Sequence, residues 1–315
     1  MSRLAAILEK PWLWAFIAAF GVWAATIAFT GGHGGGGVLT AAFTFANFFV
    51  IVGIGQMFVI TLGPGNVDLS IPATITLAGS VATKVMDGQD SLVLLGLAVA
   101  LGCGVAVGCF NYALIRVLRI PPIIATLSAS FLVQSTAIAY GRGLRIKPPP
   151  SLADFTTARI GGVPVLAICV IVLTALMAIV LQRTIFGRSV IAIGQNQRAA
   201  ALTGINVGRI RFATYVLCAI LASLCGYLLS GFSGGASLNM GEEYLLASIA
   251  VVVIGGTSVA GGFSNLPGLW GAALFLFLVV TMLNTYGLGA GIRYLATGLI
   301  IIAVIVAAGG HKTLR

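Results

Sequence analysis

Charged side chains are scarce in this sequence. Of its 315 residues, 8% are Asp, Glu, Lys or Arg, whereas 59% are hydrophobic. A soluble globular protein has roughly 25% charged residues, because its surface faces water. So few charges cannot cover a water-facing surface, and the mean hydropathy of +1.10 agrees. The composition therefore excludes an ordinary soluble domain and predicts a chain whose main solvent is lipid.

Motifs for catalysis, metal binding and ATP binding are also missing. The sequence has no GxxxxGK[ST] phosphate-binding loop, HExxH, GxSxG or Cys/His dyad. The five cysteines lie in apolar runs without CxxC spacing, and neither His33 nor His311 has a partner that would make it a ligand or a base. We therefore expect no catalytic residue, no metal site and no cofactor in this chain. Transport driven by ATP would need a separate ATPase.

Acidic residues number 7, against 17 Lys and Arg, and the net charge is +10. The basic residues stand mostly at the ends of apolar runs, which favours a role in membrane orientation over nucleic-acid binding. With both termini in the cytoplasm, most of them fall inside, including those of the loop 182–211, while the loop 142–162 faces outward. Pro148, Pro149 and Pro150 predict that this outer loop is extended. It is either a solvated loop or a docking surface for an extracytoplasmic partner.

Runs long enough to cross a bilayer recur along the whole chain. About 20 apolar residues span the hydrocarbon core. The first run, 11–30, exceeds the apolar region of a signal peptide, which has about 7–15 residues, and counts as a membrane helix. We predict an all-α, multi-pass helix bundle of about ten spans, forming a single transmembrane domain over residues 1–315. The segments are 11–30, 41–62, 67–86, 91–115, 122–141, 163–182, 212–231, 246–262, 267–286 and 292–309.

Glycine is plentiful, with 42 residues. Small residues let membrane helices approach closely, so Gly104 and Gly108 predict a helix contact on the fourth segment. Two Gly-rich interruptions, 63–72 and 255–262, divide the third and eighth segments. Irregular backbone at membrane depth survives only where it is buried in protein or lines a water-filled cavity, and paired breaks in two halves of a chain are typical of a transporter pathway.

Asp68, in the first break, is the one acidic residue that the sequence places near the middle of an apolar region. It is either a pathway residue or a cap for the helix that follows. Polar side chains within the spans, Asn47, Gln56, Asn111, Gln134 and Asn284, either bond between helices or contact a solute. The candidates for the pathway are Gln56, Gly65, Asn66, Asp68, Ser70, Gly255, Gly256, Thr257 and Asn284.

The loop 182–211 is rich in arginine, and its centre, 197–202, consists of strong helix formers. Gly204 follows as a helix stop. We therefore predict a short helix at the membrane surface. The loop either only sets orientation or docks a cytoplasmic partner.

Four sequence elements, in this order, are similar to those of one protein family. They are Gly65-Asn66-Val67-Asp68-Leu69-Ser70; Arg119-Ile120-Pro121-Pro122-Ile123-Ile124-Ala125-Thr126-Leu127; Phe186-Gly187-Arg188 with Ala192, Gly194, Asn196, Ala199-Ala200, Gly204-Ile205 and Val207; and Val252 to Gly262. The chain resembles the permease subunits of ribose-type carbohydrate ABC importers of the bacterial cytoplasmic membrane.

The resemblance implies a partner set. An importer of this type has two permease chains, identical or sisters, a cytoplasmic ATPase pair of the fused double type that binds ATP and Mg²⁺, and an extracytoplasmic solute-binding protein. The short helix at 197–202 would be the coupling helix that contacts the ATPase. The residues implied for coupling are Arg188, Asn196, Arg198, Ala199, Ala200, Gly204 and Ile205. The expected cargo is a sugar or a sugar-like solute.

The sequence departs from the family pattern at two places. Gln197 and Arg198 stand where the family commonly has acidic residues, and Pro72 replaces a glycine, which makes the first break stiffer. Two alternatives stay open beside the sugar importer: the permease of a branched-chain amino-acid ABC importer, and a self-sufficient secondary carrier.

Overall fold

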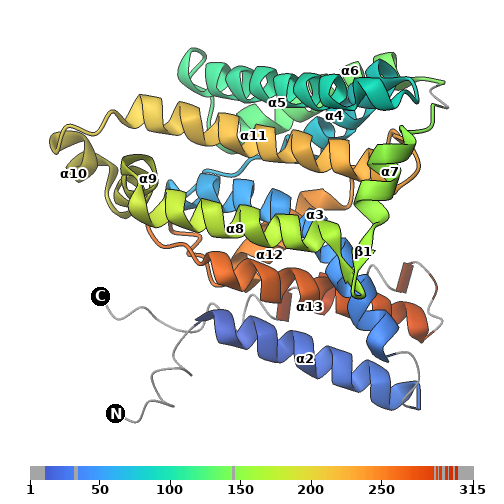
Figure 1. Ribbon diagram of the computed structural model, residues 1–315. Helices are drawn as coiled ribbons and strands as arrows, with labels where there is room; N and C mark the ends of the chain where they lie inside the picture. Colours follow the sequence, from blue (N-terminus) through green and yellow to red (C-terminus); the bar gives the residue numbers. More distant parts are fainter. Residues whose placement is uncertain are drawn as a thin grey trace, which may run out of the picture.

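The computed structural model describes residues 11–31, 35–143 and 146–286, with isolated positions between 289 and 303. Over these residues the regular elements are helices and one two-stranded hairpin, joined by turns and irregular segments (Figure 1). The elements are α2 (Pro11–Phe29), α3 (Gly35–Thr61), α4 (Ile71–Met86), η1 (Asp90–Leu92), α5 (Val93–Arg116), α6 (Pro122–Gly141), α7 (Pro150–Thr157), β1 (Arg159–Ile160), β2 (Val163–Pro164), α8 (Val165–Arg183), α9 (Ile185–Gln195), α10 (Gln197–Leu202), α11 (Val207–Phe232), α12 (Tyr244–Ile254) and α13 (Leu266–Thr285).

Seven helices in the described part of the chain are long and apolar enough to cross a membrane. They correspond to seven of the predicted segments. The third and eighth segments are instead the shorter apolar helices α4 and α12, because a Gly-rich break occupies part of each. The tenth segment, 292–309, lies largely outside the described residues, as do residues 1–10 and 304–315. The number of about ten spans and the side of the termini therefore stay predictions.

The helices α3 and α11 form the centre of the bundle. The second half of α3 is almost wholly buried, and α11 packs against α3, α4 and α5. In Figure 1 α4, α5 and α6 lie on one side of this centre, while α12, α13 and α2 lie on the other. The helices α9 and α10 stand at one end of the bundle, and α7 with the hairpin stands at the opposite end (Figure 1). The loops 182–211 and 142–162 are thus on opposite ends, as the charge distribution predicts.

The prediction that the loop 142–162 is extended is wrong for part of its length. The loop is not extended throughout, because α7 begins at Pro150, and β1 pairs antiparallel with β2. Proline at the first position of a helix lacks only an N–H that would have no helical partner, so it starts a helix well. Asp90 accepts hydrogen bonds from the Ser151 N–H (2.9 Å) and hydroxyl (2.6 Å). These bonds attach α7 to η1.

The segment 233–243, between α11 and α12, enters the bundle again. Gly235 lies near Ile146, at the α7 end, whereas a side chain on Gly241 would overlap the backbone of Pro72. Pro72 lies in the first turn of α4, about 20 Å along the helix from its other end at Met86, at the α-helical rise of 1.5 Å per residue. The segment therefore descends to membrane depth before α12 begins, and α12 is a half-length helix.

The GxxxG pair predicted on the fourth segment lies at a close helix contact. A Cβ on Gly108 would be 2.6 Å from Cα of Val216, and one on Gly104 would be 2.7 Å from the carbonyl oxygen of Ala219. Both partners belong to α11. Without side chains at these two positions, α5 and α11 pack backbone to backbone.

We expect Gly108→Ala to destabilise the bundle by about 1–3 kcal/mol, since the methyl group must push two backbones apart. Gly102→Ala is the matched control, because a Cβ there meets nothing within 4 Å. The thermal unfolding midpoint of the detergent-purified protein measures the difference. Equal midpoints for the two variants would refute the close contact.

Candidate pathway and coupling region

The first break runs from Gly63 to Ser70, between α3 and α4. Gly63 and Gly65 have φ angles of 116° and 78°, which favour glycine, and Pro64 has no N–H for a helix. The Asn66 N–H and side-chain amide both donate to the carbonyl oxygen of Gly63, at 3.3 and 3.1 Å. The backbone therefore turns here and cannot continue α3.

Polar side chains from three other places in the bundle hold this break. Gln56 Oε1 of α3 accepts the Asp68 N–H at 3.1 Å. Thr126 Oγ1 of α6 accepts the Leu69 N–H at 3.1 Å. The Tyr215 hydroxyl of α11 donates to Asn66 Oδ1 at 3.3 Å. Backbone groups that lack helical partners thus find partners inside the protein, as the lipid environment requires.

The Asp68 carboxylate lies at the centre of this network and is 1% exposed. It accepts hydrogen bonds from the Ser70 N–H (2.9 Å) and hydroxyl (2.6 Å). Asn111 Nδ2 of α5 donates to Ser70 Oγ at 2.8 Å and lies 3.4 Å from Asp68 Oδ1. Ser70 immediately precedes α4, so Asp68 holds the residue at which this helix starts, although no side chain accepts from the first N–H groups of α4 itself.

Two buried atoms of the same network have no hydrogen-bond partner among the described residues: Gln56 Nε2 and Asn111 Oδ1. A buried polar atom without a partner costs about 1–3 kcal/mol. A water molecule or a solute hydroxyl could satisfy either atom, which keeps Gln56 a pathway candidate.

The second break follows α12. Asn265, just before α13, closes it: its side-chain amide donates to the Gly255 carbonyl oxygen at 2.8 Å, and its N–H donates to Thr257 Oγ1 at 3.1 Å. Gly256 has a φ of 88°. The pathway candidates Gly255, Gly256 and Thr257 thus form a compact turn. Asn284 lies near the opposite end of α13 and does not join either break.

The two breaks and the end of α9 meet at one point. The Gly262 N–H donates to the carbonyl oxygen of Thr61, the last residue of α3, at 3.0 Å. A side chain on Gly194 would overlap both of these backbone groups, and one on Gly261 would overlap Gly63. We call Gly63, Gly194, Gly261 and Gly262 the glycine junction. The sequence interpretation did not bring these residues together, because only the fold shows that they are neighbours.

The predicted short helix is confirmed as α10. Asn196 caps it by accepting the Ala199 N–H at 3.0 Å. Gly204, with a φ of 88°, ends it, and the Ile205 N–H donates to the carbonyl oxygen of Ala200 at 3.2 Å. The preceding helix α9 was not predicted; its one local signal is Thr184, whose hydroxyl oxygen accepts the Gly187 N–H.

Most residues of this region face outward. Arg188, Arg198, Ala199 and Gly204 are exposed, whereas Ala200 is 5% exposed and Ile205 is half-buried. Leu202 is 89% exposed although it is apolar. Ala200 therefore anchors α10 to the bundle, and the rest of the helix presents a surface to a partner.

The polar candidates outside the breaks bond within the protein. The Asn47 amide donates to the carbonyl oxygen of Thr44, and the Gln134 amide donates to that of Leu238. The second of these bonds holds the segment 233–243 against α6. The structure supports bonding between segments for Gln134, whereas the Asn47 bond stays within α3 and Asn47 Oδ1 is buried without a partner among the described residues.

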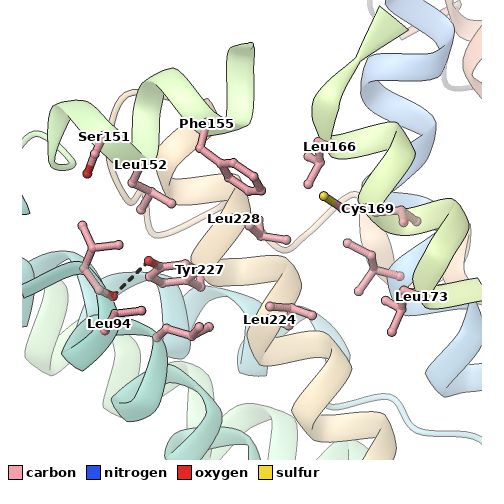
Figure 2. A pocket seen from close by; sticks show the side chains of 14 residues that line it. Leu94, Ser151, Leu152, Phe155, Leu166, Cys169, Leu173, Leu224, Tyr227 and Leu228 are labelled. Carbon is pink, nitrogen blue, oxygen red and sulfur yellow. Dashed lines mark hydrogen bonds between the residues drawn. The ribbon is translucent and has the colours of Figure 1, made fainter. Parts of the chain in front are cut away.

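A cavity of about 460 Å³ lies elsewhere, between α5, α7, α8 and α11. Half of the residues that line it are leucines, and its Tyr227 hydroxyl donates to the backbone oxygen of Val93 at 3.0 Å (Figure 2). Ser151, at its edge, donates to Asp90. The cavity offers a hydroxylated solute few free polar groups, and it is lined by neither break.

A polytopic helix bundle with two broken helices and a surface helix beside them is the architecture of a membrane transport protein. The chain belongs to the family of permease components of branched-chain amino acid transport systems, whose model matches residues 38–308. Together with the relatives below, this match confirms the predicted resemblance to the permease subunits of ribose-type carbohydrate ABC importers.

Among individual relatives, the chain is similar to permease proteins of ABC transporters, including two sugar import permeases. The chain is 32% identical over 262 residues to a probable ABC transporter permease protein, y4mJ, of Sinorhizobium fredii, covering 82% of this chain and 77% of the relative. It is 30% identical over 261 residues to the ribose import permease protein RbsC of Escherichia coli K12, covering 81% and 80%. It is 30% identical over 264 residues to the fructose import permease protein FrcC of Rhizobium meliloti, covering 81% and 73%. No solved structure matches the chain.

The role of Asp68 in holding Ser70 at the start of α4 can be tested by two substitutions. Asp68→Ala leaves the buried Ser70 N–H and hydroxyl without this acceptor, so we expect a loss of about 1–3 kcal/mol for each donor. Asp68→Asn keeps one oxygen as acceptor and should lower the thermal unfolding midpoint much less. Similar midpoints for the Ala variant and the unsubstituted protein would contradict this role of Asp68.

Proposed function

We propose that this chain is the membrane-spanning subunit of an ABC importer that carries a sugar or sugar-like solute across the bacterial cytoplasmic membrane. The family assignment and the ribose and fructose import permeases among its relatives support the proposal. The proposal includes about ten spans with both termini in the cytoplasm. ATP and Mg²⁺ bind to a separate ATPase of the fused double type, and this chain has a transport role, not a catalytic one.

The structural observation that carries the proposal is the exposed helix α10. It has caps at both ends, so its shape does not depend on a partner. Its Leu202 is an exposed apolar side chain, and Arg198 stands on the same short helix. An exposed apolar side chain beside charged ones is typical of a protein–protein contact. In the importer, α10 docks on the ATPase.

A second permease chain is supported by Glu242 and Glu243. Both side chains are exposed, and they follow Gly241, which contacts Pro72 at membrane depth. A carboxylate at this depth is costly in lipid and faces a polar cavity or a protein partner. A pathway between two permease chains provides such surroundings. The sequence did not predict that these two acidic residues lie at membrane depth, because they precede the apolar run 246–262.

The solute reaches the pathway from an extracytoplasmic binding protein, which docks at the α7 end of the bundle. Gln56 and Asn111 supply hydrogen-bonding groups of the kind that sugar hydroxyls need. Both side chains now hold the closed first break. A passage for solute therefore requires the break to rearrange. ATP hydrolysis by the ATPase provides the energy, and the movement of α10 transmits it to the break.

We expect Leu202→Asp to abolish co-purification of the permease with its co-expressed cognate ATPase, because the substitution places a charge in the apolar part of the contact. Ile160→Asp is the control. Ile160 is 67% exposed on β1, at the opposite end of the bundle. An unchanged yield of ATPase with Leu202→Asp would contradict the docking role of α10.

The class of solute is decided by uptake into liposomes that contain the complete importer and its binding protein. We expect ATP-dependent uptake of a pentose or hexose and none of leucine. Uptake of leucine would favour the branched-chain amino-acid alternative, which the family description keeps in view. Uptake by the permease alone under an ion gradient would establish a secondary carrier.

A further inference from the structure

We propose that the glycine junction transmits the movement of α10 to both membrane breaks, with Gly194 as the positioning residue. The inference rests on the proposed function, because it requires an ATPase that moves α10. It assigns the connection between the docking surface and the pathway to one backbone contact.

The path from α10 to the junction is short. Gly194 is next to the last residue of α9, and Asn196 is already the cap of α10. Between Gly194 and α10 only two residues intervene, and the Asn196 N–H is itself bonded to the carbonyl oxygen of Ala192. A displacement of α10 therefore displaces Gly194 by nearly the same distance, because the two connecting residues cannot extend much further.

The path continues directly into both breaks. Thr61 ends α3 and leads into the first break, while Gly262 lies near the end of the second. The Gly262 N–H donates to the carbonyl oxygen of Thr61 at 3.0 Å, and Gly194 lies against both groups. Gly194 meets Thr61 and Gly262 through backbone atoms, and the Gln195 side chain adds a hydrogen bond from its Nε2 to the Gly262 carbonyl oxygen at 3.5 Å. Packed contacts of this kind switch between discrete arrangements and do not deform gradually.

The other end of α9 is also held. A side chain on Gly187 would overlap backbone atoms of Leu181, in the last turns of α8. The helix α9 is thus pressed against α8 at one end and against the two breaks at the other. In this arrangement α9 pivots about its contact with α8 near Gly187, and its other end, at Gly194, moves against the two breaks.

The test uses Gly194→Ala in the complete importer, reconstituted in liposomes with its ATPase and binding protein. The added methyl group separates Thr61 from Gly262. We expect the complex to assemble and to hydrolyse ATP within about twofold of the unsubstituted rate, while solute moved per ATP falls at least about tenfold, because the spread junction no longer passes the movement of α10 to the breaks. Gly102→Ala, at an open position on α5, is the matched control and should keep the original ratio.

A second measurement avoids dependence on the fold of the Gly194 variant. Spin labels on Gln197 and Ala260, both exposed, report the distance across the intact junction. Labels on Gln197 and Val117, which is 74% exposed at the end of α5, report movement of α10 against the bundle. Between the nucleotide-free and ATP-bound complexes we expect the first distance to stay constant and the second to change.

The outcomes separate the two proposals. If the unsubstituted chain forms no complex with the ATPase, the proposed function fails. If the complex forms but Gly194→Ala moves as much solute per ATP as Gly102→Ala, the junction does not transmit the movement and the inference is overturned. A Gln197–Ala260 distance that changes as much as the Gln197–Val117 distance overturns it too, whether or not the Gly194 variant folds.

Discussion

Every backbone N–H and C=O inside a bilayer must find its hydrogen-bond partner within the protein, and the rest of this structure follows from how the chain meets that constraint at its two broken helices. An unbroken helix meets it locally. Where α3 ends at the first break, side chains of α3 and α6 supply the partners: Gln56 accepts the Asp68 N–H and Thr126 accepts the Leu69 N–H. At the second break Asn265 does so. Much of the polar chemistry inside this apolar chain therefore belongs to the breaks.

The breaks create half-length helices that an unbroken bundle would not contain. The helix α4 starts at membrane depth, and α12 both starts and ends within the bundle, with the segment 233–243 leading down to it. The sides of α4 pack against α5, α6 and α11, so the freedom to shift belongs to the ends of these short helices, whose terminal N–H and C=O groups have no helical partner. Their ends lie beside the polar groups that a solute would need. The same irregularity thus provides both hydrogen-bonding groups and the freedom to rearrange.

The sequence predicts the long helices well, because hydropathy is a local property: α2, α6 and α13 begin and end within a residue or two of the predicted segments. The helix α10 and its stop at Gly204 are also local, set by helix formers and a glycine. What depends on distant contacts was not predictable. The meeting of Gly194 with Gly262, the return of 233–243 to Pro72 and the bond from Asn111 to Ser70 each join residues far apart in the sequence. The start of α7 at Pro150 was missed for another reason, since proline favours both extended chain and the first turn of a helix.

Glycine has two different physical consequences in this chain, and the difference explains why one residue type serves both stability and motion. Gly104 and Gly108 lie between two long helices, α5 and α11, where the close approach adds packing along their length. Gly194 and Gly262 lie where a helix end meets two irregular segments, so their close approach adds little packing area. A methyl group between the long helices opposes packing and lowers stability. A methyl group at the junction instead changes the relative positions of segments that are free to move, and its effect belongs to the movement that connects α10 with the breaks.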